Sequence, residues 1–223
     1  MNAPIFDMLN QLLTNGHTFG QQGIYAEMQG NYVVAAQSYD QSIALIYQSM
    51  VMAQQSGVQI PHHIHFTFAL AHFSAARAKS VLGWAPVACT HLNQSLVALN
   101  QAIAINPNEV QYHAAAGTVL MTLGNFPEAE RAFSAALQLN PSDPSSQYMM
   151  AVLHSARGNM TAANHHYAAA QQIAPNVPQM PNFPTSATPG QGTDWINTVN
   201  NICSLLNNVF KTIGTFQDLR RSF

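Results

Sequence analysis

The sequence repeats itself at an interval of 34 residues. Similar residues recur at this step in the pairs Gly124 and Gly158, Ala129 and Ala163, Phe133 and Tyr167, Ala136 and Ala170, and Pro141 and Pro175. Pro107 precedes Pro141 by the same step. Because five features keep one register, the interval predicts two successive copies of one structural unit, at residues 110–143 and 144–177.

Each copy has the pattern of two amphipathic helices joined by a tight turn. Gly124 with Asn125, and Gly158 with Asn159, mark the turn in the two copies. The alanine that follows lets the helices approach closely, the aromatic residue fills the space between them, and the proline stops the second helix. One copy cannot bury its apolar face alone, so the sequence predicts a stacked array.

This period and residue set resemble the tetratricopeptide repeat family, whose units end in Ala-x3-Phe/Tyr, Ala and Pro. The resemblance implies an all-α fold, an α-solenoid of about four helix-turn-helix units. It also implies a concave groove lined by the first helix of each unit. The positions that line this groove are Gln111, Ala114, Ala115, Thr118, Tyr148, Met149 and Val152.

The predicted groove is neutral and partly apolar. It lacks the Lys, Asn and Arg set with which one subset of the family holds the acidic tails of chaperones. An apolar helix is therefore the better-matched ligand. The alternative is that these faces only pack on adjacent helices.

Two altered units precede the regular ones. In residues 16–57, Gly30, Ala35 and Tyr39 reproduce the signature, and the second helix is expected to continue toward Gln55. In residues 62–107, Gly83 lies about twelve residues before the aligned Ser95, which suggests an insertion at residues 84–90. We therefore predict an array from residue 16 to residue 177.

Three further segments complete the predicted domain organisation. Residues 1–15 are expected to form a short capping helix. Residues 178–192 continue a run of prolines that begins at Pro175 and form an extended linker. In residues 193–223 an apolar stripe at helical spacing predicts an amphipathic helix, formed by Trp195, Ile196, Val199, Ile202, Leu206, Val209, Phe210 and Ile213.

The apolar stripe of residues 193–213 needs a surface that covers it. The helix could fold back as a cap on its own array, or reach the groove or flank of a neighbouring subunit. The long linker favours the second arrangement, because a docked cap usually follows its repeat by a short turn. Docking on a membrane surface is disfavoured, because the polar face carries Asn, Ser and Thr in place of Lys and Arg.

The chain carries very little charge. Only 7% of its residues are charged, against about 25% in typical proteins, and 48% are hydrophobic. A net charge of -2 without a basic stripe argues against nucleic acid as a partner. Neutral surfaces lack the like-charge repulsion that keeps proteins apart, so the composition favours association.

No pattern indicates catalysis or a cofactor. No phosphate-binding loop and no Ser, His and acid motif is present. His62, His63 and His65 stand close together, but no Cys, Asp or Glu lies beside them, so a metal site is not predicted. Cys89 and Cys203 have neither a disulfide-framework nor a metal-binding spacing.

The cellular location stays open. Residues 1–16 show no basic region and no continuous apolar run, which argues against a classical secretion signal. The cytosol is the default expectation, and a neutral surface would also suit an extracellular setting.

These patterns together predict a non-enzymatic scaffold that assembles with copies of itself into an oligomer or filament. The alternative is an adaptor or secretion-type chaperone that accepts an apolar helix of a different protein in its groove.

Overall fold

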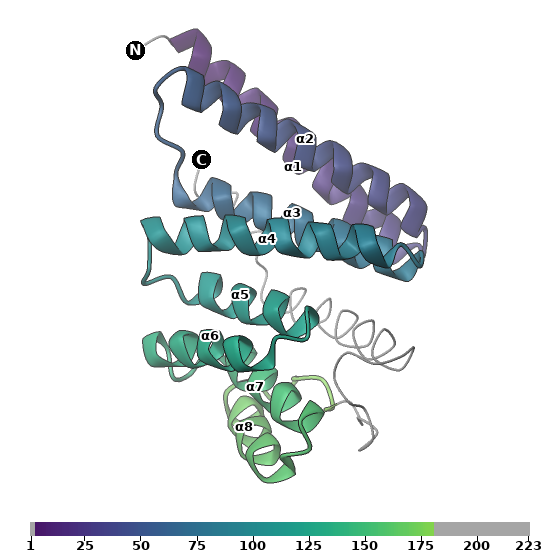
Figure 1. Cartoon of the computed structure of the whole chain (residues 1–223), viewed down its shortest axis with the longest axis vertical. Coiled ribbons are helices and arrows are strands. Elements are labelled where there is room, and N and C mark those ends of the chain that lie inside the picture. The colour runs from purple at the N-terminus through teal and green to yellow at the C-terminus, as the bar shows by residue number, and fades with distance from the viewer. Residues whose placement is uncertain (1–2, 181–223) are drawn as a thin grey trace. The chain divides into compact units, whose positions relative to one another are not determined.

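The computed structural model describes residues 3–180, and all regular elements of this part of the chain are α-helices (Figure 1). Its eight helices are α1 (Ala3–Met28), α2 (Tyr32–Gln55), α3 (His62–Val81), α4 (Ala85–Ile105), α5 (Val110–Thr122), α6 (Phe126–Leu139), α7 (Pro144–Ala156) and α8 (Met160–Ile173). The all-α solenoid fold class is confirmed. The chain divides into two compact parts between Tyr112 and His113, here called the N-terminal unit and the C-terminal unit. The predicted helix at residues 193–223 and most of the linker lie outside the described residues.

The turn between the two helices of each repeat has one geometry throughout. Its glycine adopts a left-handed backbone conformation, with φ of +73°, +78°, +80° and +77° at Gly30, Gly83, Gly124 and Gly158. At the first of these turns, Gly30 N–H donates to the Glu27 carbonyl and Asn31 N–H to the Ala26 carbonyl, which closes α1 with a Schellman motif. The Asn31 side chain then accepts from Val34 N–H and opens α2. Glycine therefore ends the first helix at all four turns, and the asparagine side chain after it caps the second helix at Asn31 and Asn159.

Proline ends the second helix of three repeats. Helices α4, α6 and α8 stop at Ile105, Leu139 and Ile173, two residues before Pro107, Pro141 and Pro175. Proline disfavours helical geometry in the residue before it and has no N–H for a helical hydrogen bond. The 34-residue step of these prolines thus marks real helix ends.

The two altered repeats are longer by whole helical turns. As predicted, α2 continues to Gln55. Its buried face repeats every seven residues, with small side chains at Ala35, Ser42 and Ser49 and the alternate positions filled by Tyr39, Ile46 and Ala53. Seven residues make almost two turns of an α-helix, so the added length keeps the same face toward the core.

Helix α4 shows the same lengthening. The insertion predicted at residues 84–90 lies at the start of this helix, because α4 already begins at Ala85. The signature places a small residue four positions before a large one, and both residues are buried. Helix α4 contains this pair twice, as Ala88 and Leu92 and, seven residues later, as Ser95 and Leu99. The insertion is accommodated as two extra turns inside the helix, which preserves the packing face.

Helix α1 corrects the prediction of a separate capping helix at residues 1–15. It runs without a break from Ala3 to Met28, through Gly16, where the first repeat was expected to begin. Gly16, Gly20 and Gly23 lie on the side of α1 that faces α2, with Ile46, Ser42 and Tyr39 respectively as their nearest neighbours. Glycine weakens a helix, yet here it allows the two backbones to approach closely, so it does not mark a boundary.

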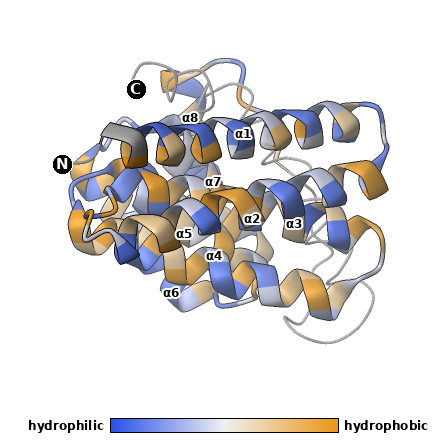
Figure 2. Ribbon diagram, turned by 90° about the horizontal axis from the view of Figure 1, so that it is seen from above, coloured by the Kyte–Doolittle hydropathy of each residue, from blue (hydrophilic) through white to orange (hydrophobic). Residues whose placement is uncertain are grey.

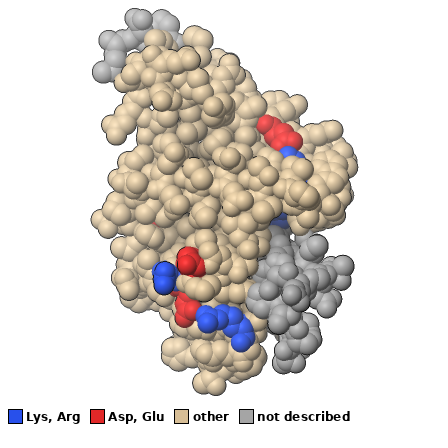
Figure 3. Space-filling model, in the orientation of Figure 1, with Lys and Arg blue, Asp and Glu red and all other residues tan. Residues whose placement is uncertain are grey.

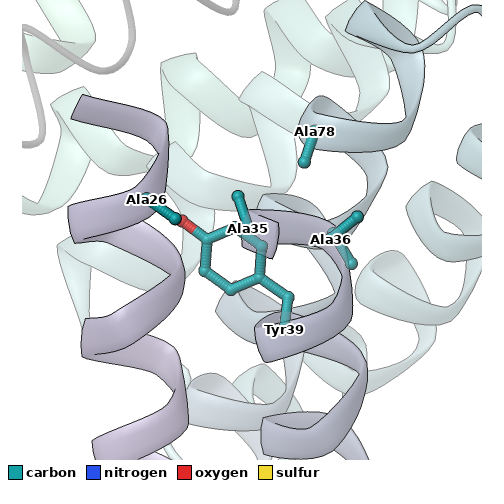
Figure 4. Packing of buried hydrophobic residues seen from close by; sticks show 6 residues of the cluster. Ala26, Ala35, Ala36, Tyr39 and Ala78 are labelled. Atoms are coloured by element: carbon teal, nitrogen blue, oxygen red, sulfur yellow. The ribbon is translucent and has the colours of Figure 1, made fainter. Parts of the chain in front are cut away.

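The core of the N-terminal unit joins α1, α2 and α3. Tyr39 is surrounded by the small residues Ala26, Ala35, Ala36 and Ala78 from these three helices (Figure 4). Figure 2 shows hydrophilic and hydrophobic residues alternating along the helices, as amphipathic packing requires. One large ring among alanines fills the space between closely spaced helices.

Gly23→Ala is expected to destabilise the N-terminal unit by about 1–3 kcal/mol. A Cβ at position 23 would lie 2.6 Å from the Tyr39 ring, which is only 1% exposed and has no room to move. Gly20→Ala in the same helix is the matched control, because its nearest neighbour would be Ser42 Oγ at 3.5 Å, an ordinary contact. That control should be neutral or stabilising by up to about 1 kcal/mol. Urea denaturation of both variants measures the difference, and equal effects would contradict the close packing.

The C-terminal unit contains the regular repeats. Ala129, Phe133 and Ala136 of α6 are completely buried, and Ala163 and Ala170 are buried at the corresponding places of α8. Tyr167, which corresponds to Phe133, is only half-buried. The repeat signature therefore forms the interior of this unit, and its last aromatic residue lies closer to the surface.

Candidate functional site

The predicted groove-lining residues lie on α5 and α7, and most of them are buried. Gln111 is exposed and Ala114 is half-buried. The others have little accessible surface, with exposed fractions of 6% for Ala115, 3% for Thr118, 1% for Tyr148, 3% for Met149 and 1% for Val152. This agrees with the alternative interpretation that these faces pack within the array. The role of the groove as a binding surface stays a prediction.

The beginning of the Pro-rich segment lies against α7. The Tyr148 hydroxyl is 3.4 Å from the Gln179 carbonyl oxygen and donates to it. Burial raises the pKa of Tyr148 to about 12, so the hydroxyl keeps its proton at neutral pH and remains a donor. The chain therefore passes over the predicted groove face before it reaches residue 181.

An exposed apolar surface, which was not found from the sequence, surrounds two neighbouring turns of the N-terminal unit. The α1–α2 turn and the α3–α4 turn lie at the same end of this unit (Figure 1), and Tyr32 and Leu82 from the two turns pack on one core cluster. Large apolar side chains around them are 43–66% exposed. We call this set the turn-end patch: Tyr25, Met28, Val33, Val34, Val81, Trp84 and Val87.

Each basic side chain on the described part is paired with a carboxylate. Each Lys or Arg between residues 3 and 180 lies within 4 Å of a carboxylate, in the pairs Arg77 with Glu27, Lys79 with Asp40, Arg131 with Glu128, and Arg157 with Glu130. On the face shown in Figure 3, the red and blue groups are few and adjacent. Most of that face is uncharged, as the composition implied.

Two of these ion pairs lie inside the N-terminal unit. Arg77 Nη2 donates to Glu27 Oε2, and the two side chains are 8% and 7% exposed. Lys79 is equally buried and donates to Asp40 at 2.5 Å and to His91 Nε2 at 2.7 Å. Three of the four charged side chains in these two pairs are therefore buried, whereas Asp40 is half-exposed.

The histidines singled out from the sequence do not form a common site. His62 Nδ1 is 2.6 Å from the Tyr112 hydroxyl, whereas His65 is buried. Burial lowers the pKa of both His63 and His65. Within residues 3–180, no group of three or more His, Cys, Asp or Glu side chains could hold a metal ion.

The remaining candidate residues divide between the surface and the region that is not described. Cys89 is an exposed free thiol. The assembly-helix residues, from Trp195 to Ile213, and Cys203 lie outside the described residues, so their role stays a prediction. Within the described part, no helix combines the length and hydrophobicity needed to span a membrane.

Comparison with known proteins identifies the repeat. Residues 114–178 match a family model described as a tetratricopeptide repeat. No curated protein sequence matches the chain.

Several solved structures resemble it at low identity. The structure "MamA MSR-1 C2" is 16% identical, covers 70% of this chain and 94% of its own, and has a TM-score of 0.48. TTC0263, a thermophilic TPR protein of Thermus thermophilus, is 17% identical, with coverages of 86% and 98% and a TM-score of 0.47. YrrB, described as a TPR protein with an unusual peptide-binding site, is 18% identical, with coverages of 71% and 86% and a TM-score of 0.39.

The family match falls on the two regular 34-residue units, and the four helices from α5 to α8 occupy the same stretch. The resemblance inferred from the sequence period is therefore confirmed, and residues 114–178 match the tetratricopeptide repeat.

Proposed function

We propose that this chain is a non-enzymatic protein-interaction scaffold that assembles with copies of itself. Its C-terminal segment, residues 193–223, would dock on an apolar surface of a neighbouring subunit. The observation that carries the proposal is the turn-end patch, in which seven large apolar side chains on and beside two adjacent turns are 43–66% exposed. Exposed apolar clusters of this kind mark interaction sites more often than free surfaces.

The donor in this assembly is the predicted C-terminal helix. Its stripe from Trp195 to Ile213 requires an apolar partner surface. Residues 181–192 precede it, and a segment in the polyproline conformation advances about 3.1 Å per residue, so they reach about 37 Å. This reach is enough to bring the helix to another molecule.

In this proposal the helix docks on the turn-end patch of the neighbouring subunit and not in its groove. Tyr148, Met149 and Val152 are 1–3% exposed and offer almost no surface to an incoming helix. The turn-end patch is accessible, and the docking of the uncharged apolar stripe on it would bury no unpaired charge. The same burial counts against the adaptor alternative, which requires an open groove for the helix of a different protein.

Leu206→Glu and Val87→Glu are each expected to convert the assembled protein into a 24.2 kDa monomer. The first variant places a carboxylate in the apolar stripe, and the second places one in the turn-end patch. Val87 is 45% exposed in the first turn of α4, where a negative charge is compatible with the helix dipole. Sedimentation velocity and electron microscopy at micromolar concentration measure the size of each species.

Two matched variants control for the added charge. Ser204→Glu lies on the polar side of the same predicted helix, and Thr161→Glu lies at an exposed position in the first turn of α8. Both should assemble like the unmodified protein. A monomeric unmodified protein would refute self-assembly, whereas an assembly that survives Leu206→Glu would show that another segment is the donor.

A further inference from the structure

Four polar side chains form a continuous hydrogen-bonded chain across three helices of the N-terminal unit. Asp40 of α2 accepts from Lys79 of α3 at 2.5 Å, and Lys79 contacts His91 Nε2 of α4 at 2.7 Å. His91 Nδ1 in turn is 2.9 Å from His72 Nδ1 of α3. We call this set the polar chain. It joins elements that are up to 51 residues apart in the sequence.

The ammonium group of Lys79 determines where each proton of the polar chain lies. Lysine can only donate, so His91 Nε2 must be an acceptor and the His91 proton must be on Nδ1. This Nδ1–H then points at His72 Nδ1, which must also accept, and the His72 proton is left on Nε2. Both imidazoles are therefore neutral, with opposite tautomers.

Few charged groups reach these two histidines. His72 is 7% exposed, and the side chain of His91 is 16% exposed. The ring of Phe68 on α3 packs perpendicular to the His72 ring, with ring centroids 4.5 Å apart. Asp40 of α2 is the carboxylate nearest to His91, at 3.8 Å, and it is already bonded to Lys79. On the same helix, Arg77 pairs with Glu27 of α1.

We propose that the polar chain is an acid-operated lock, which holds α4 against α3 and α2 near neutral pH and releases it when the two histidines are protonated. A proton on His91 Nε2 would face the ammonium of Lys79, and a proton on His72 Nδ1 would face the N–H of His91. Each protonation replaces a hydrogen bond by two opposed donors. A single Asp40 carboxylate, half-exposed and shared with Lys79, does not offset the added positive charges.

The direction of the pH effect follows from these surroundings. Burial, then His91 and then Lys79 lower the pKa of His72 to about 4, and burial and Lys79 lower the pKa of His91. An exposed histidine has a pKa of about 6.5. As the pH falls, protons therefore bind first to the open form, in which α4 is released and the two histidines are exposed. The closed form therefore loses stability progressively below about pH 6.5, until His72 is protonated in both forms near pH 4. Between pH 7 and pH 5, His72 alone shifts the equilibrium toward the open form about 20-fold.

Nuclear magnetic resonance of the full chain tests the polar chain directly. Long-range ¹H–¹⁵N spectra distinguish imidazole tautomers, and at pH 7 we expect the Nδ1–H form on His91 and the Nε2–H form on His72. Neither ring should titrate near pH 6.5. An Nε2–H tautomer on His91, or an ordinary titration of either ring, would overturn the proposal.

Hydrogen exchange of the full chain tests the release of α4. After correction for the intrinsic effect of pH, protection of the α4 amides is expected to fall at least about 20-fold from pH 7 to pH 5. In His72→Asn, the amide oxygen can accept from His91 Nδ1–H as the ring nitrogen does, but it cannot be protonated. The fall in α4 protection between pH 7 and pH 5 should therefore shrink to the contribution of His91. His165→Gln, at an exposed position of α8, is the control and should retain the full fall. An equal fall in α4 protection in His72→Asn and in the unmodified protein would exclude the lock.

Discussion

Arg77→Met is expected to lower the free energy of unfolding of the N-terminal unit by about 3–5 kcal/mol. Methionine keeps most of the apolar volume of Arg77, but it leaves the Glu27 carboxylate in the interior without its guanidinium partner. The Glu27 side chain is only 7% exposed, so water cannot replace the lost charge. Urea denaturation at pH 7, followed by circular dichroism, measures the loss.

Two controls separate the buried charge from other effects of this substitution. The double variant Arg77→Met with Glu27→Leu removes both charges and should recover most of the stability, because a buried ion pair and an apolar pair of similar volume are often nearly equivalent. Arg131→Met breaks an exposed pair with Glu128, whose side chains are 80% and 46% exposed, and should cost at most about 1 kcal/mol. If Arg77→Met costs no more than Arg131→Met, the buried-charge explanation is wrong.

Phe133→Ala is expected to destabilise the C-terminal unit by about 3–5 kcal/mol. The side chain is completely buried, and its ring lies directly on the α5 backbone, where a Cβ at Gly117 would be only 2.7 Å away. Removal of the ring leaves a cavity that alanine cannot fill. The change in the free energy of unfolding can be measured by urea denaturation, as for Arg77→Met.

Tyr167→Ala is the matched control for Phe133→Ala. Tyr167 occupies the same position 34 residues later, but it is half-buried and contacts Tyr148 with ring centroids 6.4 Å apart. The expected cost is about 1–2 kcal/mol, because less apolar area is removed from the interior. Equal costs at the two positions would mean that burial does not decide the contribution of this aromatic position.

Local signals in the sequence predicted the helix ends well. The left-handed glycine, the asparagine after it, and the proline two residues after the last helical residue each act within a few residues of one another. Their effect does not depend on what packs nearby. The 34-residue register and the length of α2 could therefore be inferred before any contact was known.

Insertions and interior glycines could not be interpreted in the same way. Gly16 can end a helix or sit inside one, and the outcome in α1 depends on Ser42 and Ile46 of the opposing helix. The extra residues before Ser95 could form a loop or two helical turns. Their multiple of seven is a usable signal for the second outcome, since it keeps Ala88 and Ser95 on one face.

The candidate surfaces were the least predictable part. Family resemblance indicated the groove, yet Tyr148, Met149 and Val152 are buried. The turn-end patch arises from residues near position 30 and near position 84, which become neighbours only when α1 to α4 are packed. Its signal in the sequence was limited to apolar residues beside turns, which are ordinarily polar.

By itself, the sequence determined the 34-residue repeat, the helical class, the turns and the scarcity of charge, because these depend on composition and on residues close together in the chain. Only the tertiary structure decided which glycines face a helix, which ion pairs are buried, and how Asp40, His72, Lys79 and His91 meet. Those properties depend on contacts between residues far apart in the sequence. Helix length and stacking bring such residues together, and a one-dimensional pattern does not specify which side chains then touch.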